Sequence, residues 1–134
     1  MRWLPLAACL AALGVCGCGL DVQSADLFLL TRTGAGRKLT LLVNDSGTIR
    51  CDGGRAKTLP DPLLLDARDL ATNLGSDVQH KLNPGGRAGV YTFTVRLQQG
   101  TLTFPDTAAA RHSELARAEL FALQAAQGPC GLPG

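Results

Sequence analysis

A strict alternation of apolar and polar residues in the second half of the chain limits the fold more than any other feature. The apolar members are Tyr91, Phe93, Val95 and Leu97, and threonine or arginine stands between them. This period of two is typical of a strand with one buried face. Gln98-Gln99-Gly100 predicts a turn, after which Leu102 and Phe104 continue the apolar face on a returning strand. We therefore expect an antiparallel sheet that buries one of its faces.

Three shorter apolar segments nearer the N-terminus predict an antiparallel meander. The first begins at residues 27–30, the second alternates over residues 39–43, and the third covers residues 49–51. Turns at residues 33–36 and 44–47 separate them, and each contains glycine, which adopts the positive φ that tight turns need. We expect these strands to belong to the same sheet.

Two amphipathic segments predict helices. In the first, Asp61 is expected as the N-cap, Pro62 as the first helical residue and Gly75 as the end. Its apolar face is made of Leu63, Ala67, Leu70, Ala71 and Leu74. In the second, one of the side chains of residues 106–107 is expected to cap a continuous helix that ends at residues 128–129.

The resulting order is strand-strand-strand-helix-strand-strand-helix over residues 26–134. Because short connections favour antiparallel neighbours, we predict one α+β domain with a five-stranded antiparallel sheet and two helices on one face. Residues 52–57 are interpreted as a connector, since Gly53-Gly54 before Arg55 lacks the spacing of a phosphate-binding loop. Residues 76–89 form the longest irregular stretch, and such loops often carry function.

Residues 1–17 have the pattern of an export signal. A short positive start is followed by 18 uncharged residues, many of them apolar. Val15-Cys16-Gly17-Cys18 resembles the site at which bacterial lipoproteins are lipidated and cleaved. The resemblance implies that Cys18 carries diacylglycerol and that residues 18–25 tether the domain to the outer face of the bacterial cytoplasmic membrane.

Alternatives to this assignment remain open at the N-terminus. Cys16 is the other candidate for the lipid. Ordinary cleavage after Gly17 would release a soluble secreted protein, and retention of the segment would leave an uncleaved anchor. The bias towards Ala, Gly, Leu and Arg, with few Lys, further resembles proteins of high-GC actinobacteria.

Cys51 and Cys130 are the two cysteines that remain after cleavage before a lipidated Cys18. Two cysteines in an exported chain most often form one disulfide. A metal or redox pair is the alternative, but neither residue has a CxxC partner or a nearby histidine. We therefore predict one structural disulfide, and we expect no metal and no cofactor.

Charge and motifs exclude several classes of function. The chain carries 13 basic and 11 acidic residues, a net charge of +2 that becomes +1 when Arg2 leaves with the signal. This balance indicates no binding surface for nucleic acid and no polybasic stretch for anionic lipid. Attachment to a membrane must therefore come from the lipid or from an apolar segment. His80 and His112 belong to no HExxH pattern, and no Gly-x-Ser-x-Gly elbow is present. Asp66 and Asp69 resemble a carboxylate pair but are interpreted as the solvated face of the first helix.

These observations favour a non-enzymatic, envelope-anchored binding or interaction domain, with an envelope protein as one kind of partner. The predicted topology also resembles that of the subtilisin-inhibitor-like family, which implies a serine-protease inhibitor as the alternative, with residues 76–89 facing the protease. The two disulfides usual in that family have no full counterpart, because only Cys51 and Cys130 are available. A hydrolase that gathers His80 or His112 with distant carboxylates is the third hypothesis.

Overall fold

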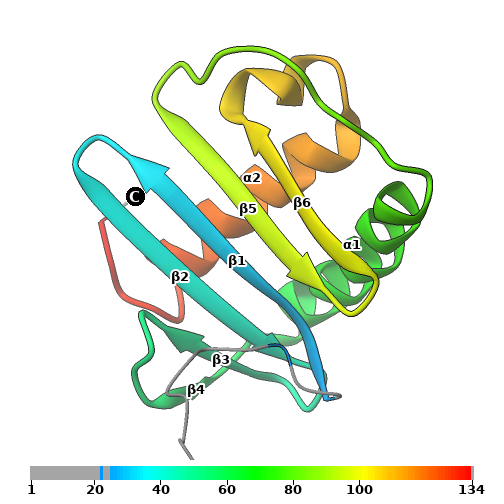
Figure 1. Cartoon of the computed structure of the whole chain (residues 1–134). Helices are drawn as coiled ribbons and strands as arrows, with labels where there is room; N and C mark the ends of the chain where they lie inside the picture. Colours follow the sequence, from blue (N-terminus) through cyan, green and yellow to red (C-terminus); the bar gives the residue numbers. More distant parts are fainter. Residues whose placement is uncertain (1–21, 23–24, 134) are drawn as a thin grey trace, which may run out of the picture.

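The structure, a computed structural model, describes residue 22 and residues 25–133 (Figure 1). The expected signal peptide and both candidate lipidation sites, Cys16 and Cys18, lie outside these described residues. Within them, no helix combines the length and the apolar character needed to cross a bilayer.

One antiparallel sheet forms the centre of the domain. Its strands are β1 (Asp26–Gly34), β2 (Arg37–Asn44), β3 (Thr48–Cys51), β4 (Ala56–Thr58), β5 (Tyr91–Leu97) and β6 (Gly100–Pro105). They lie in the order β4-β3-β2-β1-β5-β6, and every neighbouring pair is antiparallel. Alternation in β2 and β5 puts the predicted apolar residues on the buried face, so both strands are confirmed.

The sheet has six strands, so the prediction of five is wrong. The missing strand is β4, which belongs to the segment interpreted as a connector. Asp52 and Gly53 both adopt positive φ, and the Gly54 N–H donates to the Cys51 carbonyl at 3.0 Å, which turns the chain back along β3. All three residues of β4 are exposed at the edge of the sheet, so they show no alternation that a sequence pattern reveals.

Two α-helices, α1 (Asp61–Gln79) and α2 (Ser113–Gln127), lie on the same side of the sheet (Figure 1). Between them and the sheet lies one apolar core, in which Phe28 of β1 meets Phe121 of α2 edge to face with ring centroids 5.5 Å apart. The predicted face of α1 is confirmed, since Ala67, Leu70 and Leu74 are fully buried.

Both predicted ends of α1 are wrong. The N-cap position is held by Pro60, and Asp61 is the first helical residue with no side-chain capping bond. The helix also continues through Gly75 to Gln79. Gly75 is buried where α1 approaches the β5–β6 turn, and a Cβ there would stand 2.8 Å from the Gln99 side chain. This glycine therefore permits close packing rather than ending the helix.

The last predicted helix is divided in two. A short 3₁₀ helix, η1 (Asp106–Ala110), follows β6, and α2 begins only at Ser113. The cause is Asp106, whose carboxylate accepts hydrogen bonds from the loop before β5 and so does not cap a long helix. The end of α2 before Gly128 agrees with the prediction.

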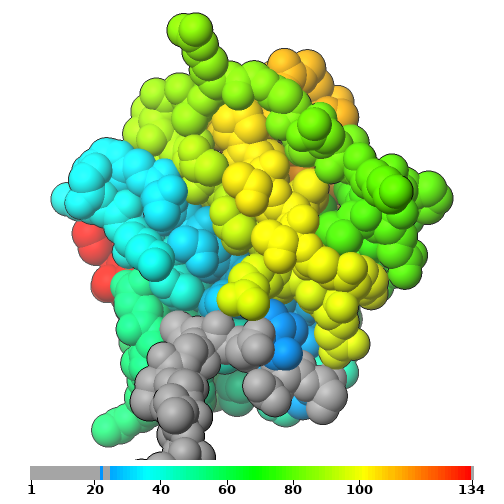
Figure 2. Space-filling model, viewed as in Figure 1, coloured from blue at the N-terminus to red at the C-terminus, as the bar shows by residue number. Residues whose placement is uncertain are grey.

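A row of threonines crosses the face of the sheet that points away from the helices. The register brings one threonine from each of four neighbouring strands into a single row: Thr40, Thr31, Thr94 and Thr103. Figure 2 shows this side of the molecule, with the surfaces of β5, β6 and the β1–β2 hairpin open to view. The two faces of the sheet thus differ as the alternating sequence requires.

Candidate functional site

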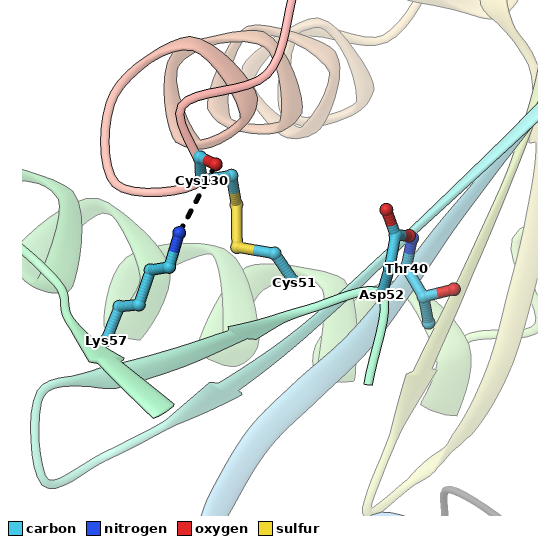
Figure 3. Close-up of a disulfide and its surroundings, with 5 residues drawn as sticks. All are labelled: Thr40, Cys51, Asp52, Lys57 and Cys130. Carbon is cyan, nitrogen blue, oxygen red and sulfur yellow. Dashed lines mark hydrogen bonds between the residues drawn. A yellow bond between two sulfur atoms is a disulfide. The ribbon is translucent and has the colours of Figure 1, made fainter. Parts of the chain in front are cut away.

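Cys51 and Cys130 form a disulfide that joins β3 to the chain after α2 (Figure 3). Their Cα atoms are 5.8 Å apart, and the predicted pairing is confirmed. Lys57 of β4 adds a second link, because its ammonium donates to the Cys130 carbonyl at 3.4 Å. The C-terminal segment is therefore attached to the β3–β4 edge of the sheet.

The same segment folds back on the end of α2. The Leu132 N–H donates to the Ala126 carbonyl at 2.7 Å, and the Cys130 N–H donates to the Ala125 carbonyl at 3.0 Å. These bonds satisfy carbonyls that the end of a helix otherwise leaves free. In Figure 2 the C-terminal segment, in red, emerges beside the β1–β2 hairpin, in cyan.

A cavity of about 290 Å³ lies between this segment and the β1–β2 hairpin. It is lined by Arg32, Arg37, Lys38, Leu39, Asp52, Ala126, Leu132 and Pro133. Three of these residues are cations, four have apolar side chains, and one is an acid. Ligand sites of proteins typically combine such an apolar lining with a few charged or polar groups.

The three cations have no ion-pair partner within residue 22 and residues 25–133. No described carboxylate lies within 4.0 Å of Arg32, Arg37 or Lys38. Arg32 instead stands over the Tyr91 ring, with its guanidinium carbon 4.7 Å from the centroid. Arginine presents a planar fork of donors that matches carboxylate and phosphate groups, so this cluster is suited to an oxyanion.

The acid in the lining, Asp52, is already bound to the backbone of the protein. Its carboxylate accepts from the Thr40 N–H at 2.8 Å, and its own N–H donates to the Thr40 carbonyl at 2.8 Å (Figure 3). These bonds hold β3 to β2 just beyond Cys51. Asp52 therefore braces the wall of the cavity, and the lining keeps a formal excess of positive charge.

The cavity offers binding groups rather than reactive ones. No histidine, cysteine, serine or tyrosine appears in its lining, so among the described residues that form it there is no nucleophile and no general base at neutral pH other than the braced Asp52. The arrangement can fix an anion and an apolar group side by side.

Among the described residues, neither histidine of the hydrolase hypothesis forms a hydrogen bond or an ion pair with a carboxylate. His80 follows α1, and its Nδ1 lies 2.7 Å from the Ser76 carbonyl. His112 precedes α2 as its N-cap residue. In the part of the chain that the structure describes, no group of three or more His, Cys, Asp or Glu side chains is placed to hold a metal ion.

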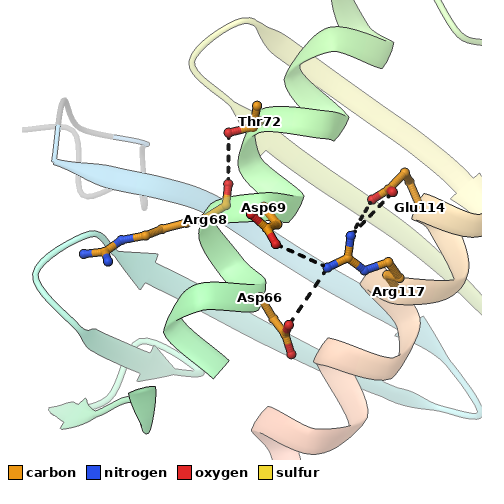
Figure 4. Close-up of polar contacts among 6 residues, drawn as sticks. All are labelled: Asp66, Arg68, Asp69, Thr72, Glu114 and Arg117. Atoms are coloured by element: carbon orange, nitrogen blue, oxygen red, sulfur yellow. Dashed lines mark hydrogen bonds and ion pairs between the residues drawn. The ribbon is translucent and has the colours of Figure 1, made fainter. Parts of the chain in front are cut away.

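Asp66 and Asp69, the carboxylate pair noted in the sequence, meet an arginine from the other helix. The guanidinium of Arg117 on α2 lies 3.9 Å from Asp66 and 3.7 Å from Asp69, and it also contacts Glu114 at 3.4 Å (Figure 4). All of these groups are partly exposed. They connect α1 to α2 across the outer surface, which is a structural role.

The loop proposed to face a protease is shorter than predicted, because residues 76–79 are helical. Its last residues are held by Asp106, which accepts from the N–H groups of Gly89, Val90 and Tyr91 at 2.6, 2.8 and 3.0 Å. The bond from Tyr91 and those from Val90 and Gly89 lower the pKa of Asp106 against the opposing effect of burial.

The pKa of Glu119 on α2 shifts in the opposite direction. Burial and the nearby charge of Asp106 raise its pKa from 4.5 to about 7, and its Oε1 is buried without a hydrogen-bond partner in the described part of the chain. Neither carboxyl lines the cavity beside the disulfide. We assign the pair to stability and not to the site.

Glu119→Gln is expected to remove a pH dependence of stability. The raised pKa of Glu119 means that the folded chain prefers the protonated carboxyl, so its contribution is complete below about pH 4.5 and is lost as the pH rises through 7. Urea unfolding measures the free energy of unfolding of each protein at pH 5 and at pH 8. Between these pH values the wild type should lose about 1 to 2 kcal/mol more of it than the variant, a figure reduced because Glu119 is partly exposed. Asp77→Asn, which removes one negative charge from α1, is the control; equal pH dependence in all three proteins would contradict the assignment.

Comparison of the chain with protein-family models, with curated proteins and with solved structures finds no match in any of the three. The resemblances to lipoprotein signals and to subtilisin-inhibitor-like proteins therefore stay predictions.

Sequence reasoning missed the basic residues of the cavity. The overall charge balance hides them, because acidic residues elsewhere offset the total. Their spacing is a signal that could have found them. Arg32 lies before the turn between β1 and β2, and Arg37 and Lys38 lie after it, so the pairing of the two strands brings them to the same end of the hairpin. The apolar half of the lining has no such signal, since Ala126 and Leu132 arrive only through the disulfide and the folding back of the C-terminus.

Proposed function

We propose that this chain is an exported, lipid-anchored and non-enzymatic protein whose folded domain binds a small anion in the cavity beside the disulfide. The observation that carries the proposal is that Arg32, Arg37 and Lys38 line an apolar cavity without a described carboxylate partner. The register places Arg32 and Arg37 on the same face of the hairpin as Leu39, whereas Lys38 follows at its edge. Cations gathered in this way repel one another, and an oxyanion relieves that repulsion when it binds.

The disulfide supports export. Disulfides persist in secreted and envelope proteins and are rare in reducing compartments. Cys51 and Cys130 are joined to each other, which leaves the cysteines of the N-terminal segment as the remaining candidates for modification. We propose Cys18 as the lipidated residue, and the outer face of the bacterial cytoplasmic membrane as the location.

The anchor is tested by the intact mass of protein extracted from membranes. We expect the wild type to have the mass of residues 18–134 plus diacylglycerol, and Cys18→Ala to lack the added mass and to leave the membrane fraction, because one thiol carries the anchor. Cys16→Ala is the matched control and should keep the lipid. A wild-type mass without acyl groups, or loss of the lipid only in Cys16→Ala, would contradict the assignment.

The cavity is tested by replacing its two exposed cations. We expect acetate and inorganic phosphate to shift the backbone amide signals of residues 32–39 and 130–133, and Arg37→Gln/Lys38→Gln to weaken binding at least about tenfold, since charged hydrogen bonds are lost. The measurement is an NMR titration of the full chain.

Lys81→Gln/Arg87→Gln is the matched control for this titration. Both residues are exposed, lie in the loop after α1 and do not line the cavity, and the variant has the same net charge. Equal loss of binding in the two double variants would show a general charge effect and would contradict a site in the cavity.

A further inference from the structure

We infer that the ligand is a diffusible amphiphilic anion, an oxyanion head joined to an unbranched apolar chain of about eight carbons. The inference rests on the proposed function, because it names the ligand class of the same cavity. Three features carry it: the division of the lining into a charged and an apolar part, the volume, and the position of the cavity in the sheet.

The lining has two chemically different parts. The basic side chains come from the β1–β2 hairpin, whereas Leu39, Ala126, Leu132 and Pro133 supply hydrocarbon. Leu39 and Ala126 belong to the main core, with exposed fractions of 5% and 1%, so this part of the cavity reaches down to the core. The exposed hydrocarbon belongs to Leu132 and Pro133. A simple inorganic anion would leave it in contact with water, whereas an attached apolar chain would cover it.

The volume limits the length of that chain. Because a water molecule occupies about 30 Å³ in the liquid, 290 Å³ corresponds to about ten non-hydrogen atoms. A carboxylate with eight carbons has that number of atoms. This size lies at the lower end of the range of ligand pockets in proteins and is too small for a whole phospholipid.

The position of the cavity favours a diffusible ligand over a lipid of the anchoring membrane. β1 begins at Asp26 and ends at Gly34, at the hairpin with β2 (Figure 1), and residues of this hairpin line the cavity. Nine residues of strand span about 25 to 30 Å, so Asp26 and the cavity lie at opposite ends of β1. No residue before Arg32 lines the cavity, so among the described residues a ligand from solution need not contact the N-terminal end of β1.

Calorimetric titration with sodium alkanoates tests the inference. The full chain is held in nanodiscs of phosphatidylcholine, with empty nanodiscs as the blank, and is titrated with acetate, butanoate, hexanoate, octanoate, decanoate and octyl phosphate. We expect affinity to rise about two- to fourfold per methylene up to octanoate and then to level off for decanoate and octyl phosphate, which both have more than about ten non-hydrogen atoms. Leu132→Ala should reduce the gain per methylene, and Leu65→Ala, at a leucine of α1 with 59% exposure, should not.

The outcomes separate this inference from the proposed function. If acetate and inorganic phosphate bind as tightly as octanoate, the cavity is an anion site as proposed, but the inference that its ligand is amphiphilic is wrong. If no anion binds at all, both are wrong. If phosphatidylglycerol added to the nanodiscs competes with octanoate on the same protein, the ligand is a membrane lipid and the diffusible ligand is wrong.

Discussion

Replacement of both Cys51 and Cys130 by alanine is expected to lower the free energy of unfolding by about 4 to 5 kcal/mol. The disulfide joins residues 79 positions apart, and in the chain-entropy model a cross-link over so long a loop strongly restricts the unfolded chain. Since small domains are stable by only about 5 to 15 kcal/mol, this loss takes a large share of the total. Urea unfolding of the variant and of the wild type measures it.

The single variants Cys51→Ala and Cys130→Ala are the controls. Each opens the same loop, so each should lose about as much stability as the double variant. Reduction of the wild type with dithiothreitol should lower its midpoint in the same way. An unchanged midpoint on reduction would contradict the cross-link as a main source of stability.

Opening the disulfide is also expected to weaken binding in the cavity. Leu132 and Pro133 follow Cys130, and Asp52 follows Cys51, so the cross-link holds two walls of the cavity at a fixed separation. The hydrogen bond from Leu132 to Ala126 keeps only one of these walls on α2. Stability and the geometry of the site therefore depend on the same covalent bond.

The parts of the fold that were predicted correctly are those in which burial and sequence period coincide. In β2 and β5 every inward residue is apolar, and in α1 the apolar residues return with the helical period. The disulfide followed from counting the cysteines that remain if the chain is exported and lipidated at Cys18, as predicted. The strand and helix periods are local patterns, and the number of cysteines is a chemical constraint on the whole chain.

The errors occur where a long-range contact changes what a residue does. Gly75 looks like a helix end but allows α1 to pack against Gln99, 24 positions away in the chain. Asp106 looks like a helix cap, but its carboxylate accepts hydrogen bonds from the N–H groups of Gly89, Val90 and Tyr91 at the start of β5. β4 pairs with β3 through its backbone while all its side chains are exposed. No single-sequence pattern records these contacts.

The candidate site was harder to predict than the fold for the same reason. Its basic residues come from one hairpin, but its apolar wall comes from the end of α2 and the C-terminal segment, nearly a hundred residues later. The packing of α2 on the sheet, the disulfide and the folding back of residues 128–133 bring the two together. Cavities assembled from distant segments have no spacing that a sequence motif can express.

Gly34→Ala is expected to cost about 3 kcal/mol or more in the free energy of unfolding. Gly34 ends β1 opposite Tyr91 of β5 and has a φ of 147°. A Cβ at this position would stand 2.1 Å from the backbone carbonyl oxygen of Val90, so no side-chain rotation can relieve the overlap. The two strands would have to separate where the sheet meets the cavity.

Gly36→Ala is the matched control, and the comparison is made by urea unfolding. Gly36 stands two residues later in the same turn with a φ of 69°, but a Cβ added there would meet nothing within 4 Å, so alanine should cost only about 1 to 2 kcal/mol for the left-handed backbone. Equal losses in the two variants would show that backbone conformation alone decides the cost and that the contact with Val90 does not.

The same pair of variants connects the fold to the proposed site. Arg32 lies two residues before Gly34, and Arg37 and Lys38 follow directly after Gly36, so the shape of this hairpin sets the spacing of the cations. Under conditions in which both variants are folded, Gly34→Ala should weaken acetate binding more than Gly36→Ala, because only the former displaces β1 from β5. Arg32 stands over the ring of Tyr91, the first residue of β5. Equal acetate affinity in both variants would therefore mean that this contact with β5 does not help the cations to bind the anion.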